Sequence, residues 1–142
     1  MKTLQIIIFS LIFTLFYSCK NNASILSENS QLKRKWRLVE FEPFTKIQLK
    51  ENHAYLDLSP NTENLEYRMG CNTINIQLIK INQQTFRIVD KSSTGNFCKN
   101  MELEFAFQKF ASNDVIYSIE NHFLTLKTKD GNIAKFVAED WD

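Results

Sequence analysis

The sequence predicts an α+β domain: a strongly curved, mostly antiparallel sheet of about seven to eight strands, shaped as an open or cracked barrel, with one packed α-helix. Short segments of alternating apolar and polar side chains recur along the chain, bounded by Pro, Gly, Asn or Asp. A single stretch near residue 105 instead has apolar residues at helical spacing. Strands joined by short turns pair as antiparallel neighbours, and a helix then covers the sheet.

The amino terminus predicts a lipoprotein signal peptide over residues 1–18. Lys2 precedes a nearly unbroken apolar run that ends at Tyr17, and Ser18 stands directly before Cys19. The thiol and amine of Cys19 can carry acyl chains, and two or three chains hold a protein firmly at a membrane. The alternatives are an ordinary secretory signal or a membrane span, although the run is shorter than the roughly 20 residues that a span needs.

These features predict a lipid-anchored protein of the cell envelope, at the outer membrane on a face that the sequence does not specify. Residues 19–32 are polar and small, so we expect a flexible tether there and a folded domain over residues 33–142. Of the 17 basic side chains only Lys2 precedes Cys19, so the rest of the chain balances its 16 acidic side chains. This neutrality argues against nucleic acid as a partner and leaves membrane contact to the acyl chains.

Within the domain, strands are expected on both sides of the helix. They cover residues 36–41, 54–58, 65–69, 74–81 and 85–89 before it, and 115–119, 123–127 and 133–137 after it. Residues 91–96 (KSSTGN) are polar and predict a loop.

The helix is expected over residues 101–111, after Asn100 as a candidate cap. We expect Met101, Phe105 and Ala106 to face the sheet. Three polar side chains are then expected in water: Glu102, Gln108 and Lys109. Phe107 points about 200° away from Phe105 on a helix, so Phe107 or Phe110 is the candidate lining of an apolar groove. Glu102 and Glu104 are expected as charges that favour the helix start and too divergent to form an acid/base pair.

Cys71 and Cys98 form an even pair in a chain whose leader predicts an oxidising compartment. They are candidates for a disulfide, and the alternative is a pair of buried free thiols.

No residue pattern predicts catalysis, a metal or another cofactor. His53 and His122 lie in polar turns without a Cys, Asp or Glu at ligand spacing. Ser92, Ser93 and Thr94 lack the surroundings of a nucleophile, and three glycines in the whole chain exclude a phosphate-binding loop.

Three motifs appear in a fixed order: Trp36 in TrpArgLeuVal, then Gly70-Cys71-Asn72, then Thr94 four residues before Cys98 and an acidic helix start. Over residues 33–139 this set resembles the META/HslJ-like family of small exported or lipid-anchored domains. The resemblance implies a fold and a compartment, and it supplies no catalytic residues. Ile76 stands where the family usually has Gly, so we expect a different turn there, with Asn72 or Asn75 left-handed.

The expected function is that of a non-enzymatic envelope protein, in binding or in envelope stress, with an envelope protein or an apolar ligand as its partner. One alternative is an inhibitor of a secreted enzyme such as lysozyme, for which the 91–96 loop is the candidate tip. Another is a carrier or pilot-like protein that holds an acyl chain or peptide in the apolar groove, by analogy between folds. A hydrolase would need convergent polar groups that the sequence does not supply.

Overall fold

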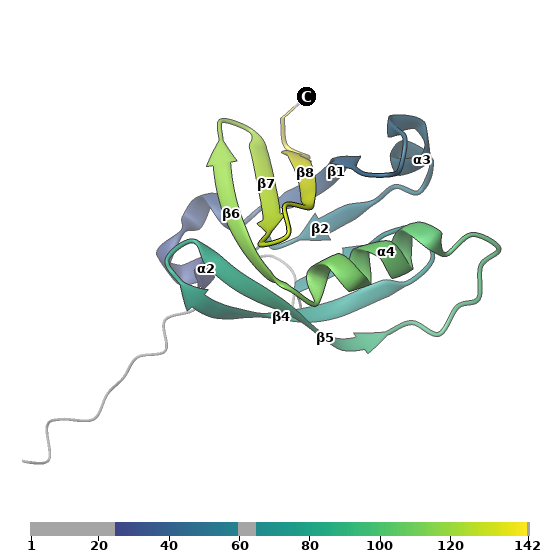
Figure 1. Ribbon diagram of the computed structural model, residues 1–142, viewed down its shortest axis with the longest axis horizontal. Helices are drawn as coiled ribbons and strands as arrows, with labels where there is room; N and C mark the ends of the chain where they lie inside the picture. The colour runs from purple at the N-terminus through teal and green to yellow at the C-terminus, as the bar shows by residue number, and fades with distance from the viewer. Residues whose placement is uncertain (1–24, 60–64, 142) are drawn as a thin grey trace, which may run out of the picture.

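A computed structural model describes residues 25–59 and 65–141, which form a closed antiparallel β-barrel with its strands in chain order (Figure 1). The strands are β1 (Lys35–Phe41), β2 (Tyr55–Asp57), β3 (Leu65–Arg68), β4 (Thr73–Asn82), β5 (Thr85–Ser93), β6 (Asp114–Glu120), β7 (Phe123–Thr128) and β8 (Ile133–Ala138). The helices are α2 (Ile25–Glu28), the short 3-10 helix η2 (Ser30–Leu32), α3 (Lys46–Glu51) and α4 (Glu102–Ala111).

Pairing of β1 with β8 closes the barrel, with Trp36 opposite Ala138 and Leu38 opposite Phe136. The predicted curved sheet and its strands are therefore confirmed, and the barrel is closed rather than open or cracked. β5 runs through Ser93, so the first half of the predicted 91–96 loop is strand. Ile76 lies inside β4 beside an irregularity in its pairing with β5. The expectation of a left-handed Asn72 or Asn75 is wrong, since the described non-glycine residues with positive φ are His53 and Asn121.

Large side chains fill the interior of the barrel. Among the largest fully buried side chains are Trp36, Tyr67, Phe86, Phe107 and Phe136. An eight-stranded barrel encloses just enough space for its own side chains, so this interior is a packed core. The described residues supply all eight strands of this barrel and its core.

Helix α4 packs on the barrel through the face opposite to the one predicted. Phe105 is 59% exposed, whereas Phe107 is fully buried. Leu103, Phe107 and Phe110 face inward at the i, i+4, i+7 spacing of a buried helical stripe. The Phe107 ring lies 5.1 Å from Tyr67, 5.8 Å from Phe41 and 6.2 Å from Phe136 between centroids. Phe107 thus belongs to the core, and its assignment to an apolar groove is wrong.

The segment before β1 is also part of the fold. Ile25 and Leu32 are buried, and the Trp36 Nε1–H donates to the Leu32 carbonyl at 3.0 Å. Glu28 forms an ion pair with Lys80 of β4. Residues 25–32 therefore do not belong to the tether predicted over residues 19–32. The predicted signal peptide, Cys19 and residues 20–24 lie outside the described residues. No helix in the described ranges is long and apolar enough to cross a membrane.

Helix α3 was not predicted from the sequence, although its start carries a signal. The Thr45 hydroxyl accepts from the Gln48 N–H at 3.3 Å, and the Gln48 side chain accepts from the Thr45 N–H at 2.8 Å. This reciprocal capping box satisfies backbone groups that the first turn leaves unpaired. Leu49 then anchors α3 to the core.

Candidate functional site: an anchored loop at the barrel rim

The turn between β3 and β4 meets the loop between β5 and α4, and this meeting unites most of the motif residues. Gly70, Cys71 and Asn72 come from the turn, and Thr94 and Cys98 come from the loop. Cys71 and Cys98 form a disulfide, with their Cα atoms 5.9 Å apart, so of the two alternatives the structure contains the bonded one. Trp36 lies elsewhere, in the core, and its motif role is packing.

Asn72 connects the loop to the barrel through all of its side-chain polar groups. Its Oδ1 accepts from the Thr94 hydroxyl and from the Asn96 N–H, both at 2.9 Å. Its Nδ2 donates to the Asn96 carbonyl at 3.2 Å and to Glu104 Oε1 at 2.9 Å. The Thr94 hydroxyl also accepts from the Thr73 N–H at 3.2 Å. These bonds fix the loop at two points before it reaches the disulfide.

Glu104 is the residue of this site that the sequence reasoning missed. It was expected only as a charge that favours the helix start, yet its side chain is buried, at 2% exposed. Its Oε2 accepts from the Asn72 N–H at 2.7 Å, which complements the bond to Oε1. No ion pair with Glu104 occurs among the described residues. A buried carboxylate requires such donors, because burial without hydrogen bonds is costly. Its position on the inward side of α4, next to Leu103, was the available signal.

Gly70 occupies a place that a side chain would not fit. Its φ is +128°, and a Cβ added there would collide with Oδ1 of Asn52, at the end of α3. Glycine is the residue that adopts such a φ without strain. Gly95 in the loop has open space around it. The glycine of the Gly-Cys-Asn turn therefore permits close packing of α3 against the turn.

Residues 94–100, between β5 and α4, form the anchored loop, and Phe97 is its exposed tip. It is 99% exposed, and all residues from 91 to 100 are exposed. The neighbouring Asn96 is held by Asn72, and Cys98 is held by the disulfide. An apolar ring is thus presented to solvent from a backbone fixed on both sides.

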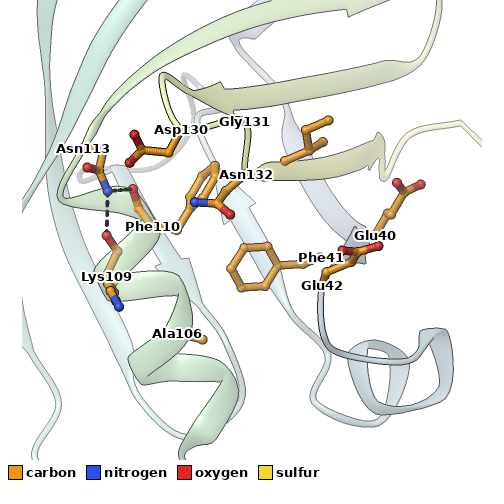
Figure 2. A pocket seen from close by; sticks show the side chains of 11 residues that line it. Glu40, Phe41, Glu42, Ala106, Lys109, Phe110, Asn113, Asp130, Gly131 and Asn132 are labelled. Atoms are coloured by element: carbon orange, nitrogen blue, oxygen red, sulfur yellow. Dashed lines mark hydrogen bonds between the residues drawn. The ribbon is translucent and has the colours of Figure 1, made fainter.

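A cavity of about 470 Å³ lies between the C-terminal part of α4, the end of β1 and the turn between β7 and β8 (Figure 2). Phe41 and Phe110, each 5% exposed, supply its aromatic part, and Ala106 and Ile133 are its aliphatic residues. Acidic side chains surround it: Glu40, Glu42 and Asp130, with Lys109 as the basic one. Of the two residues predicted to line a groove, Phe110 lines this cavity and Phe107 does not.

Two tyrosines, the buried Tyr67 and the half-buried Tyr55, have raised pKa values. Tyr67 Oη donates to both carboxylate oxygens of Asp90, at 3.2 and 3.1 Å, and burial raises the pKa of Tyr67. Burial also raises the pKa of Asp90, and the bond from Tyr67 opposes this rise. Burial and the hydrogen bond to Glu66 raise the pKa of Tyr55 to about 12. Both phenols therefore remain protonated donors at neutral pH.

The two histidines lie apart from the loop. His53 is exposed, with φ +48°, and lines a different hollow on the barrel wall. His122 stacks on Trp141 with centroids 4.6 Å apart, and its Nδ1 is buried without a partner among the described residues. No cluster of His, Cys, Asp and Glu that could hold a metal occurs in the described part of the chain.

The Ser92 hydroxyl accepts from Asn75 Nδ2 at 2.9 Å, a bond between β5 and β4.

Comparison with known proteins identifies the chain by its domain. The family model of the META domain matches residues 30–141, which include the Gly-Cys-Asn turn, the anchored loop and α4. No curated protein and no solved structure matches the chain. The match also includes η2, in agreement with the packing of Leu32 in the core. Because the match spans well over half of the 142 residues, the chain belongs to the META domain family.

Proposed function

We propose that this protein is a non-enzymatic, lipid-anchored component of the cell envelope that binds a partner protein through the anchored loop, residues 94–100. The observation that carries the proposal is the 99% exposure of Phe97 between two fixed residues. Buried aromatic side chains supply much of the energy of protein interfaces. Exposure of an apolar Phe ring to water is unfavourable in the free protein. Burial of the ring against a partner would remove that apolar surface from water and favour binding.

The fixed backbone favours binding for a second reason. Ordering a flexible loop on association reduces affinity, and a loop already held in place avoids part of that cost. Three kinds of contact hold this one: the Cys71–Cys98 disulfide, the hydrogen bonds of Asn72 and the pairing of β5 with β4.

Envelope location is supported by sequence and disulfide together. The leader before Cys19 is typical of acylated exported proteins, and disulfides persist in oxidising compartments. A role in envelope stress is compatible with this location.

Inhibition of a secreted enzyme such as lysozyme is the more specific version of the same proposal. An inhibitor needs a protruding loop. The exposed residues continue beyond the expected 91–96 tip and include Phe97. An apolar-ligand carrier is the second candidate function. Since the barrel interior is filled, its ligand would have to occupy an outer hollow such as the cavity of Figure 2.

Photocrosslinking in living cells tests the proposal. A benzoylphenylalanine would replace Phe97 in the full chain with its native leader, and the matched control would carry the same group at Phe105, which is 59% exposed on α4. We expect a discrete protein adduct at position 97 and none at 105. The absence of an adduct at 97, or the same adducts at both positions, would contradict the proposal.

Lysozyme inhibition is measured separately, with the purified protein and a Phe97→Ser variant. Inhibition by the parent protein that the variant loses would identify the inhibitor version. Activity of lysozyme unchanged by either protein would exclude lysozyme as the target.

A further inference from the structure

A second hollow, of about 580 Å³, lies on the outer wall of the barrel beside α3 and is independent of the anchored loop. Its lining combines the outward side chains of β1 and β8 with α3, the start of β7 and the C-terminal segment. Its basic and aromatic lining residues include Arg37, Lys46, Lys50, Phe123, Lys135 and Trp141.

Aromatic and aliphatic side chains form its apolar wall. The rings of Phe123 and Trp141 have centroids 6.0 Å apart, and Trp141 also stacks on His122. Val39 and Val137 also belong to the lining. Trp141 nevertheless remains 47% exposed, which leaves part of its ring available for contact.

Basic side chains line the same hollow as this wall. Arg37, Lys46, Lys50 and Lys135 form no ion pair with any described residue. Two other basic residues nearby in the sequence are paired: Arg34 with Asp140 at 3.7 Å, and Lys35 with Glu139 at 3.1 Å. Glu40 is the one acidic residue in the lining, and it lies opposite Lys135 in the pairing of β1 with β8.

This local excess of positive charge stands out because the chain after residue 18 balances its charges. It also distinguishes this hollow from the cavity of Figure 2, where three carboxylates accompany one lysine. Charge complementarity therefore favours an anion here.

From these contacts we infer that the hollow beside α3 binds a small amphipathic anion: an apolar body against Phe123 and Trp141, with a carboxylate or phosphate head near Lys46 and Lys50. The volume of about 580 Å³ lies within the roughly 300 to 1,000 Å³ typical of small-molecule sites. A free inorganic anion would leave the aromatic wall unused, and a neutral apolar molecule would leave the basic groups unused.

Direct titration tests this inference on residues 20–142, which contain the whole barrel and its core. Decanoate and decyl phosphate supply the two anionic heads, and neutral decyl maltoside supplies the same chain without charge, all below their micelle concentrations. Acetate and inorganic phosphate supply the heads alone. Trp141 is the reporter, because Trp36 is buried in the core and a Trp141→Phe variant isolates its signal.

We expect saturable binding of at least one decyl anion, and the stronger of the two identifies the preferred head. The variant K46Q/K50Q should weaken this binding about tenfold or more, because it removes two charges from the rim. The control K91Q/K127Q removes two lysines that are also exposed but lie outside the lining, and it should bind like the parent. Circular dichroism verifies that each variant is folded.

Equal binding of decyl maltoside would overturn the inference, and so would equal losses in the two lysine pairs. Binding by acetate or phosphate alone at the same affinity would show a simple anion site and would also overturn it. None of these results depends on Phe97, so they leave the proposed function to its own test.

Discussion

At residue 72 only an amide matches the surroundings. The side chain must donate to Glu104 and to the Asn96 carbonyl while it accepts from Thr94 and from the Asn96 N–H. An Asp there would place one carboxylate against another, and an apolar residue would leave a buried carboxylate with a single donor. These hydrogen bonds explain why the third residue of the Gly-Cys-Asn motif is asparagine.

Glu104→Gln should destabilise the domain by about 1 to 3 kcal/mol, because an amide NH₂ would face one of the two Asn72 donors inside the protein. Urea unfolding of the variant measures the loss. Glu102→Gln is the matched control on the exposed side of the same helix turn, and it should change stability by less than about 0.5 kcal/mol. Equal effects of the two substitutions would contradict a specific role for the buried carboxylate.

Gly70→Ala should destabilise the domain by more than about 1 kcal/mol, since the new Cβ meets Asn52 and the backbone has a positive φ. Gly95→Ala provides the comparison, because nothing lies near its added Cβ. Thermal melting of both variants is the measurement. A harmless Gly70→Ala would show that Asn52 and α3 move aside without cost.

At the scale of the element, the strands were predictable and the orientation of the helix was not. Alternating side chains indicated every strand because one face of each lies in a packed core. In α4, six of the ten residues are apolar and they lie on more than one side of the helix, so two candidate faces were available. Leu103, Phe107 and Phe110 gave the better stripe, and preference for the Phe105 side led to the wrong face. The partner of Glu104 lies 32 residues away, a separation over which no local pattern applies.

Phe107→Ala should cost about 3 to 5 kcal/mol, because it empties the space between three core rings. Phe105→Ala removes the same atoms from an exposed position and should change stability by less than about 0.5 kcal/mol. Denaturant unfolding curves of the two variants compare them directly. The reverse order of effects would mean that α4 packs through its other face.

At the scale of the whole molecule, one covalent link joins the turn between β3 and β4 to the loop before α4, and the two cysteines lie 27 residues apart in sequence. Reduction of Cys71–Cys98 should destabilise the domain by about 3 to 4 kcal/mol in the chain-entropy model. Thermal unfolding with and without a reductant measures the effect, and a variant with serine at both positions should not respond to the reductant. The barrel should remain folded after reduction, because its core and strand pairing do not depend on the bond.

The proposed anchor gives a prediction of its own. Cys19→Ala should prevent acylation and should leave the protein uncleaved or released from the membrane fraction. Mass spectrometry and detergent partitioning of the variant are the measurements. A variant with the mass and partitioning of the parent protein would contradict lipid attachment at Cys19.

Because Ile25 and Leu32 pack in the core, few residues remain between the proposed lipid anchor at Cys19 and the folded barrel. Ile25 follows Cys19 by six residues, and six residues span at most about 20 Å when fully extended. Over so short a reach, a partner that also resides at the membrane surface meets the barrel at a high effective concentration. A weak contact through the Phe97 ring would then suffice at the membrane, and the same contact would fail in dilute solution.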